Sequence, residues 1–310
     1  MVLPQSVVVL GGAASEMAAM LRDALPELDV LMSGPAPDLP YAVIGFQPGA
    51  KIADYAEVSW VHISGAGADG MLMALNEGRA KPALITRTVG QMGRQIGEYV
   101  LSYVLANRQR HADRAALQQA RRWDVEAAAP RPVAGLRAMI IGTGGIGSGV
   151  ADMLSAVGMS CLGVSRSGRE SEGFDAVIRW DDLPDVLHDV DVIVGALPLT
   201  PRTDRLIGPN MLARSNGALF INVGRGATAD VPAVLAALEA GHLRHAVLDV
   251  LPVEPLPVGD PLWLHPKVTL TPHVSGLTQP QDAVTAFVAA YRALERGERP
   301  DLIVDPDAGY

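Results

Sequence analysis

The chain has 310 residues, one cysteine and a formal net charge of −9, and this length predicts about two domains. Hydrophobic residues make up 49% and charged residues 19%, which is typical of a globular protein and excludes a disordered chain. One cysteine cannot form an internal disulfide. The acidic balance argues against nucleic-acid or anionic-membrane binding, because both need clustered positive charge.

The N-terminal residues 1–12 contain a short apolar run without a basic segment before it, which predicts a first β-strand and not a signal peptide. No run approaches the roughly 18 consecutive apolar residues of a transmembrane helix. We therefore expect a soluble, cytoplasmic protein.

Short apolar runs alternate with helical patterns over the first hundred residues, and we predict strands at 7–10, 42–45, 60–63 and 83–86. This alternation predicts a parallel sheet. A longer helical pattern covers 91–123. The basic run at its end, Arg121-Arg122-Trp123, is interpreted as a solvated helix face, with an anion-binding patch as the alternative.

A second alternating series starts after a turn-rich break at 130–135, with predicted strands at 138–141, 161–164, 192–196, 218–223, 245–250 and 268–270. Their nearly continuous apolar character predicts strands that are covered on both faces. A last helix is predicted over 280–296. The pattern predicts an α/β protein with a doubly wound parallel sheet.

A glycine-rich segment follows the strand at 138–141 and precedes a helical pattern; it consists of Gly142, Thr143, Gly144, Gly145, Ile146 and Gly147. In the order strand, G-x-G-x-x-G, helix, the first glycine permits a tight turn and the second lets a pyrophosphate approach. The third lets the helix pack on the strand. The helix N-terminus would bind the pyrophosphate through its N–H groups. We expect a dinucleotide site here.

The next strand ends in Ser165-Arg166-Ser167. Sites that prefer NAD carry an Asp or Glu near this point, which binds the ribose hydroxyls. Here a guanidinium replaces the carboxylate, and it can pair with a 2′-phosphate. The sequence favours NADP(H), with NAD(H) possible. In the alternative interpretation, Arg166 only stacks on adenine and the site accepts either dinucleotide.

Three charged residues follow apolar strands downstream: Arg225, Glu254 and His273. The carboxyl ends of parallel strands form the ligand edge of such a sheet, so we expect the three to lie close together. Arg225 could bind a carboxylate and polarise a ketone. His273 could donate a proton, with Glu254 orienting its imidazole. Each residue alone is more often a surface residue, and it is their joint appearance that favours a site.

These residues occur within several ordered motifs, which are Gly142–Gly147, the run 196–203, Asn222–Gly226, the segment 248–255 and Thr271–Gly276, together with 60–69 and the closing pair 309–310. In this order the chain resembles the D-isomer-specific 2-hydroxyacid dehydrogenases, and most of all their glyoxylate/hydroxypyruvate reductase branch. The resemblance covers nearly the whole chain. Many members have an acidic residue where this chain has Ser-Arg-Ser.

The resemblance implies a Rossmann-type domain, residues 104–278, inserted into a smaller flavodoxin-like substrate domain made of 1–103 and 279–310. It implies that Asp249 lies near the nicotinamide, and that backbone N–H groups of Ala66 and Gly67 help bind the substrate carboxylate. It implies a homodimer. It further implies cofactor contacts by Leu197, Pro198, Thr203, Val223, Ser275 and Gly276.

The expected activity is reduction of a small 2-keto acid to the D-2-hydroxy acid by hydride transfer, without a metal. A phosphite or formate dehydrogenase of the same fold is one alternative, and a dinucleotide-sensing regulator that resembles a corepressor is another. No residue for the distal group of the substrate could be assigned. Possible pocket neighbours are Trp60, His62, Met71 and Arg94, although core or surface positions fit each of them better.

Overall fold

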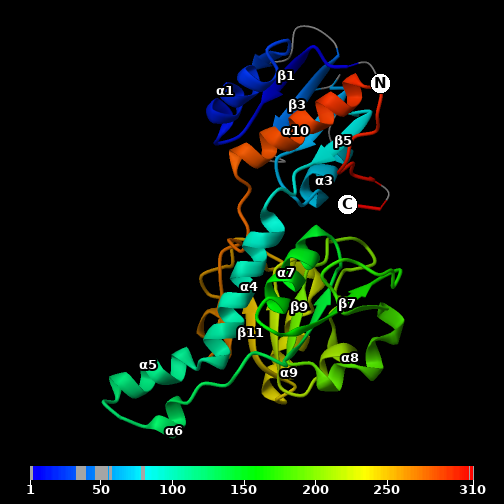
Figure 1. Ribbon diagram of the computed structural model, residues 1–310. Helices are drawn as coiled ribbons and strands as arrows, with labels where there is room; N and C mark the ends of the chain where they lie inside the picture. Colours follow the sequence, from blue (N-terminus) through cyan, green and yellow to red (C-terminus); the bar gives the residue numbers. More distant parts are fainter. Residues whose placement is uncertain are drawn as a thin grey trace. The chain divides into compact units, whose positions relative to one another are not determined.

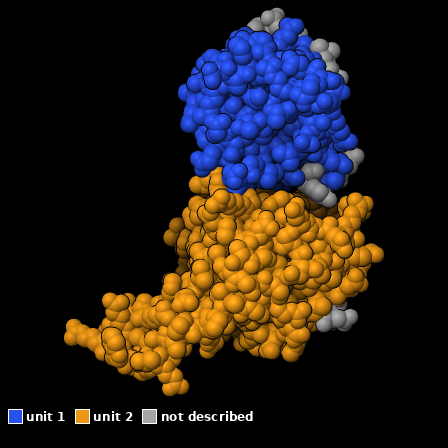
Figure 2. All heavy atoms as spheres, viewed as in Figure 1, with its two compact units in different colours: residues 1–92, 278–310 blue, residues 93–277 orange. Residues whose placement is uncertain are grey.

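The structure is a computed structural model that describes residues 3–32, 40–45, 55, 58–77, 81–306 and 308–309. It divides into two compact units, Met1–Met92 with Thr278–Tyr310 and Gly93–Leu277 (Figure 2). The predicted boundary at residue 103 falls inside helix α4 (Met92–Arg108), which this division assigns to the second unit from Gly93 onwards. Within the described part of the chain, no helix is long and apolar enough to cross a membrane.

In the described part of the first unit, five parallel strands form a sheet in the order β2-β1-β3-β4-β5. This is the flavodoxin-like strand order. The strands are β1 (Ser6–Val9), β2 (Asp29–Leu31), β3 (Tyr41–Gly45), β4 (Trp60–Ile63) and β5 (Leu84–Arg87). Helices α1 (Ala14–Ala24), α3 (Asp69–Glu77) and α10 (Pro280–Glu295) belong to the same unit.

Successive strand residues face opposite sides of this sheet, so apolar side chains are buried on both faces. On one face Val7 packs in a core with Leu21 of α1 and Phe287 of α10, and these two helices lie side by side (Figure 1). On the other face Val8 packs in a core with Met71 of α3. Helix α10 thus covers one face of a sheet whose described strands all lie within residues 6–87.

The second unit is described throughout its backbone, and its seven parallel strands have the order β12-β11-β10-β9-β6-β7-β8. This is the Rossmann order extended by one strand. The strands are β6 (Arg137–Ile141), β7 (Ser160–Ser165), β8 (Ala176–Arg179), β9 (Val192–Gly195), β10 (Ala218–Asn222), β11 (Leu243–Leu248) and β12 (Val268–Leu270). The α/β fold with two parallel sheets confirms the predicted fold class.

Regular and 3₁₀ helices connect these strands. The α-helices after α4 are α5 (His111–Gln119), α6 (Val125–Ala128), α7 (Gly145–Ser155), α8 (Pro209–Leu212) and α9 (Val231–Glu239). The 3₁₀ helices are η1 (Trp180–Asp185), η2 (Leu187–Asp189), η3 (Gly226–Thr228) and η4 (Pro261–Leu264). Helix α9 begins after Asp230, whose carboxylate accepts a hydrogen bond from the Ala233 N–H and so satisfies one free donor of the first turn.

Glycines allow α4 to cross α7 at close range. A Cβ atom added to Gly93 would lie 2.5 Å from the Gly145 carbonyl oxygen, and one added to Gly97 would lie 2.7 Å from that of Gly149. Larger side chains at these points would separate the helices. Because α7 begins in the glycine-rich segment, α4 packs directly on the helix that starts there.

The single helix predicted over 91–123 is wrong, because the chain there forms α4 and α5. Arg110 between them has φ 54°, and a left-handed residue cannot continue an α-helix. The basic run follows the end of α5: Arg121 has φ 53°, and Arg122 pairs with Asp124 at 2.9 Å. Its residues are exposed, as predicted, but they lie between α5 and α6 and not on a helix.

The prediction missed strands β2 and β8. Strand β2 has three residues, which is too short for a visible pattern. In β8 both end residues are exposed and the inner two are half-buried, so there is no continuous apolar run. Of the possible pocket neighbours, Trp60, His62 and Met71 are buried in the first unit. Arg94 is exposed and pairs with Glu98 at 3.2 Å.

Candidate active site

The glycine-rich segment forms a tight turn between β6 and α7. Gly142 has φ 109°, and a Cβ atom added there would lie 2.6 Å from the Ala196 carbonyl oxygen. A Cβ on Gly147 would overlap the Gly142 carbonyl oxygen, so the helix rests directly on the turn. A Cβ on Gly144 would meet nothing within 4 Å. The open side of the turn therefore faces free space at the start of a helix.

This geometry fits a dinucleotide pyrophosphate. Gly144 is the N-cap residue of α7, so the N–H groups of Gly145, Ile146 and Gly147 lie in the first helical turn and have no acceptor within the helix. They and the positive end of the helix dipole favour an anion at this position. The residues present thus suit the group that the sequence predicted.

The loop after β7 lies beside this turn. Ser171 Oγ donates to the Thr143 carbonyl oxygen at 3.3 Å, and Ser165 Oγ accepts from the Gly168 N–H at 3.0 Å. Arg166 and Ser167 are exposed. The loop therefore has a defined turn on which Arg166 is exposed.

A second arginine next to this loop was missed by the sequence reasoning. Arg179, the last residue of β8, pairs in register with Ser165, and a Cβ atom on Gly168 would lie 2.7 Å from Arg179 Cγ. Its guanidinium is 3.6 Å from Asp181 Oδ2. The signal was lost because β8 itself was not predicted.

The loops after β9 and β10 meet at the same sheet edge. Thr203 Oγ1 donates to the Pro198 carbonyl oxygen at 2.7 Å and so closes the turn after β9. The Val223 N–H donates to the Gly195 carbonyl oxygen at 2.9 Å. A Cβ on Gly224 would lie 2.6 Å from the Leu197 carbonyl oxygen. The structure thus brings Leu197 and Pro198 together with the segment that leads to Arg225.

Backbone contacts hold Arg225 at the end of β10. Its carbonyl oxygen accepts from Thr228 Oγ1 at 2.6 Å and from Asn222 Nδ2 at 3.3 Å. The following residue, Gly226, packs so closely on the backbone of Leu251 that a Cβ atom would overlap it. Arg225 therefore lies next to the segment that carries Glu254.

His273 and Glu254 form a direct pair. His273 Nδ1 is 2.8 Å from Glu254 Oε2, and their side chains are 46% and 37% exposed. The other carboxylate oxygen of Glu254 accepts from the Leu251 N–H at 2.8 Å. A carboxylate only accepts hydrogen bonds, so Nδ1 carries a hydrogen and Nε2 is the nitrogen left for chemistry.

Asp249 is buried beneath the loop that carries His273. One of its carboxylate oxygens accepts from Thr271 Oγ1 at 2.6 Å and from the Val274 N–H at 2.8 Å. The other accepts from the Ser275 N–H at 3.0 Å. The expected cofactor residues Ser275 and Gly276 belong to this same loop. The structure thus gives Asp249 a role that sequence reasoning did not identify, as the anchor of the His273 loop.

The predicted carboxylate ligands Ala66 and Gly67 lie in the first unit, after β4. Both are partly exposed. The Ala66 carbonyl oxygen accepts from Arg87 Nη1 at 2.9 Å, which fixes the backbone of this loop within its own unit.

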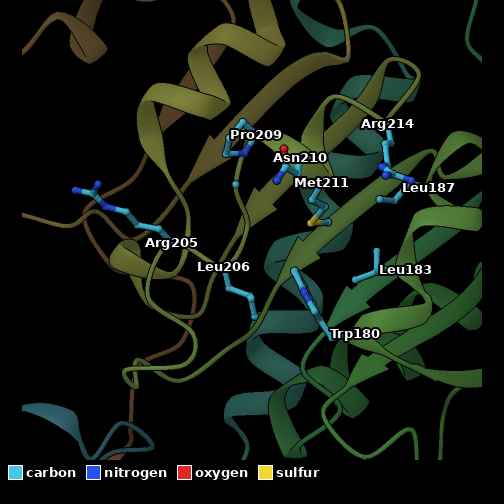
Figure 3. A pocket seen from close by; sticks show the side chains of 10 residues that line it. Trp180, Leu183, Leu187, Arg205, Leu206, Pro209, Asn210, Met211 and Arg214 are labelled. Carbon is cyan, nitrogen blue, oxygen red and sulfur yellow. The ribbon is translucent and has the colours of Figure 1, made fainter.

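A depression of about 300 Å³ lies elsewhere in the second unit (Figure 3). Its described lining residues are Trp180, Leu183, Leu187, Arg205, Leu206, Gly208, Pro209, Asn210, Met211 and Arg214. They include no carboxylate or imidazole, and the Arg205 side chain points away from Trp180 (Figure 3). Nor do the described residues contain a group of three or more His, Cys, Asp or Glu side chains able to hold a metal.

Comparisons with known proteins agree with this geometry. Residues 101–275 match the family model "D-isomer specific 2-hydroxyacid dehydrogenase, NAD binding domain". The chain is 34% identical over 307 residues to glyoxylate/hydroxypyruvate reductase A of Serratia proteamaculans, and the match covers 96% of each chain.

Two solved structures have the same fold. One is a D-isomer specific 2-hydroxyacid dehydrogenase from Xanthobacter autotrophicus in complex with NADPH and MES, with a TM-score of 0.87, 31% identity and coverage of 99% of this chain and 100% of that one. The other is an NADPH-dependent glyoxylate/hydroxypyruvate reductase from Sinorhizobium meliloti in complex with NADP and sulfate, with a TM-score of 0.85, 26% identity and coverage of 99% and 100%. The chain belongs to the D-isomer specific 2-hydroxyacid dehydrogenase family.

Proposed function

We propose that this protein is a cytoplasmic, NADPH-dependent reductase of small 2-keto acids of the glyoxylate or hydroxypyruvate type, and that it forms the D-2-hydroxy acid. The observation that carries the proposal is the pair of His273 Nδ1 and Glu254 Oε2 at 2.8 Å. Such a partly exposed imidazole with an orienting carboxylate is suited to general acid–base catalysis. The glyoxylate/hydroxypyruvate reductases among its relatives support the substrate class.

The proposed reaction adds a hydride and a proton across the ketone. A dinucleotide held at the glycine-rich segment would supply the hydride, with both electrons, that adds to the carbonyl carbon. His273 donates its Nε2 proton to the carbonyl oxygen, which becomes the hydroxyl group, and the imidazole is left neutral. Glu254 holds Nδ1–H throughout and so keeps Nε2 directed to the substrate.

Arg225 is the proposed ligand of the substrate carboxylate. A guanidinium can bind a carboxylate through two parallel hydrogen bonds and can polarise the neighbouring ketone. The backbone N–H groups of Ala66 and Gly67 stay the predicted additional donors to that carboxylate. Arg225 would thereby orient the ketone for protonation by His273.

The cofactor site is proposed to prefer NADP(H), with NAD(H) as a possible second cofactor. The exposed Arg166 on a defined turn beside the glycine-rich segment supports this preference, because a guanidinium attracts a 2′-phosphate and the position has no carboxylate to repel it. NADPH and NADP in the two similar structures also support it. Thr143, Leu197, Pro198, Thr203, Val223 and Gly276 are proposed to contact the rest of the dinucleotide.

The decisive assay mixes the purified protein with NADPH or NADH and a panel of 2-keto acids that includes glyoxylate and hydroxypyruvate, and follows the loss of reduced-nicotinamide absorbance. We expect turnover, faster with NADPH. No turnover with any keto acid would overturn the proposal. Reduction of NADP⁺ by phosphite or formate would identify a different enzyme, and tight dinucleotide binding without turnover would indicate a regulator.

Cofactor preference is tested by the Arg166→Ala variant and direct titration of NADPH and NADH. Loss of a charge-assisted hydrogen bond should weaken NADPH binding by about tenfold to a hundredfold and leave NADH binding nearly unchanged. The matched control is Arg137→Ala, which removes an exposed arginine that pairs with Asp189 at 3.4 Å at the other end of the sheet. An equal loss for both dinucleotides would contradict the 2′-phosphate role of Arg166.

We also propose that the protein is a homodimer in which a second copy of the chain packs on the segment from α5 to α6. This segment belongs to the second unit and extends away from the rest of that unit (Figure 1). None of residues 111–119, all of which are described, is buried. Trp123 is 97% and Val125 74% exposed, so a second copy of the chain would remove apolar surface from water here. Light scattering should show a dimer for the wild type and a monomer for Trp123→Ser. The control Trp263→Ser changes another exposed tryptophan and should stay dimeric.

A further inference from the structure

One buried carboxylate accepts hydrogen bonds from residues on both sides of His273 in its loop. Asp249 is 1% exposed, and it accepts hydrogen bonds from Thr271, Val274 and Ser275. Its carbonyl oxygen also accepts from the His273 N–H at 2.9 Å. His273 itself has φ 56°, a conformation that residues other than glycine adopt only when their surroundings impose it.

Helix α4 also contacts the loop that carries His273. The Tyr99 hydroxyl is 2.6 Å from Thr271 Oγ1, and Gln95 Oε1 accepts from the Leu277 N–H at 3.0 Å. Residues 95 and 99 are four apart and lie on the same helix face. One face of α4 therefore contacts both ends of the segment 271–277, in whose middle His273 lies.

The direction of the hydrogen bonds follows from the groups themselves. Thr271 Oγ1 donates to Asp249, and a hydroxyl has one hydrogen. Thr271 can therefore only accept from Tyr99, and the phenol must be the donor. Burial raises the pKa of Tyr99 above its ordinary value; the Thr271 hydrogen bond opposes this, and the charge of Asp249 adds a smaller effect that also raises it. The phenol thus keeps its hydrogen at neutral and moderately alkaline pH.

We propose that Tyr99 is a positioning residue for this enzyme: through the ordered chain Tyr99 to Thr271 to Asp249, its hydroxyl holds His273 in the orientation that faces Glu254. In this proposal Tyr99 acts only through Thr271 and Asp249. The proposal rests on the proposed function only as far as His273 is the acid. The structural part of it, that Tyr99 orders the loop, is independent of any substrate.

The first experiment measures loop order in the protein without substrate. Tyr99→Phe removes only the hydroxyl, and hydrogen–deuterium exchange reports on the amides of Val274 and Ser275, which bond to Asp249. We expect faster exchange there than in the wild type. No change is expected in the control Ser102→Ala, which removes a hydroxyl that bonds to the Tyr99 backbone carbonyl and leaves the phenol in place. Unchanged exchange in Tyr99→Phe would overturn the proposal, whatever reaction the protein catalyses.

The second experiment separates positioning from general stability by kinetics. Tyr99→Phe should lower kcat by about threefold to tenfold, the effect of one neutral hydrogen bond, while the Kd for NADPH stays within about twofold. Thr271→Val should lower kcat further because it removes the whole chain, and Thr271→Ser should restore it. A loss confined to KM or to NADPH binding would contradict a role through His273.

A double mutant tests whether Tyr99 acts through His273. In a His273→Gln background the Tyr99→Phe change should cause no additional loss of the residual turnover, because its target is gone. If Tyr99→Phe lowers turnover by the same factor in both backgrounds, the hydroxyl acts independently of His273 and the proposal fails. If the wild type reduces no keto acid at all, the proposed function fails, and hydrogen exchange alone decides whether Tyr99 orders the loop.

Discussion

His62 and His273 are both held by hydrogen bonds, but they lie in opposite environments. His62, in the central part of the first unit, is fully buried, and its ring nitrogens lie 2.7 Å and 2.9 Å from the hydroxyls of Thr86 and Thr88. Its ring packs edge-on against Phe287. His273 is half-exposed in the second unit, and its partner is the Glu254 carboxylate.

The difference shows how the surroundings suit one residue type to a structural role in the first unit and to the proposed acid–base role in the second. Burial lowers the pKa of His62 to about 3, so at neutral pH it is an uncharged core residue that satisfies two buried hydroxyls. His273 has an ionisable partner on one nitrogen and solvent access for the other. Only the second arrangement can exchange a proton with a bound molecule.

The largest effect should come from His273→Gln. Loss of the proposed acid should lower turnover by roughly 10²–10⁴-fold, while direct titration shows nearly normal NADPH affinity. The control His188→Gln changes an imidazole that is 77% exposed and should leave turnover unchanged. Retained turnover in His273→Gln would show that this residue is not the acid, and His273 would then not differ from His62 in function.

His62 should instead control stability and its dependence on pH. Its folded pKa of about 3 lies below the ordinary value of 6.5, so below pH 6.5 the unfolded chain takes up a proton that the folded chain does not. This stability is fully present above pH 6.5 and decreases as the pH falls towards 3, by about 1.4 kcal/mol per pH unit.

The His62→Leu variant tests this linkage by urea unfolding between pH 7 and pH 4. It should lose about 1–3 kcal/mol at pH 7, because the Thr86 and Thr88 hydroxyls lose a partner. Its stability should then fall less steeply with acid than that of the wild type. An identical acid dependence in both proteins would show that His62 is not the neutral core residue described here.

The Glu254→Gln variant tests whether His273 needs its carboxylate partner. Loss of a charge-assisted hydrogen bond to the imidazole should lower kcat by about tenfold to a hundredfold, with little change in unfolding free energy because the pair is partly exposed. Glu239→Gln, at an exposed position at the end of α9, is the control and should be silent. Turnover equal to the wild type would show that His273 needs no orienting carboxylate.

The smallest effect is expected from Thr88→Val, which removes one hydroxyl partner of His62. The free energy of unfolding should fall by about 0.5–1.5 kcal/mol, and turnover should not change. Thr269→Val is a matched control, because Thr269 Oγ1 lies 2.9 Å from His245 Nε2 at a less buried position. An equal or larger loss in the control would show that burial does not set the strength of these pairs.

Much of the fold was predictable because apolar runs and glycine turns are local signals. The glycine-rich segment and the strands before Arg225 and His273 were located correctly for this reason. Strands β2 and β8 were missed, because one is short and the other is only half-buried. The break at Arg110 was also missed, since a left-handed arginine has no distinct sequence pattern.

The residues around the site divide in the same way. Glu254 and His273 were predicted as a pair because both follow parallel strands, whose carboxyl ends share one edge. Arg179 was not identified, because its place beside Ser165 depends on the register of an unpredicted strand. Tyr99 was not identified either, because 172 residues separate it from Thr271.

By itself, the sequence determined the family, the two parallel sheets, the dinucleotide turn and the residue types of the proposed chemistry, because these depend on short motifs and on hydrophobic periodicity. Only the tertiary structure decided that His62 is a neutral core residue, that Asp249 anchors the His273 loop and that Tyr99 donates to Thr271. Those properties depend on burial and on contacts between residues far apart in the chain, and local sequence patterns do not encode either of them.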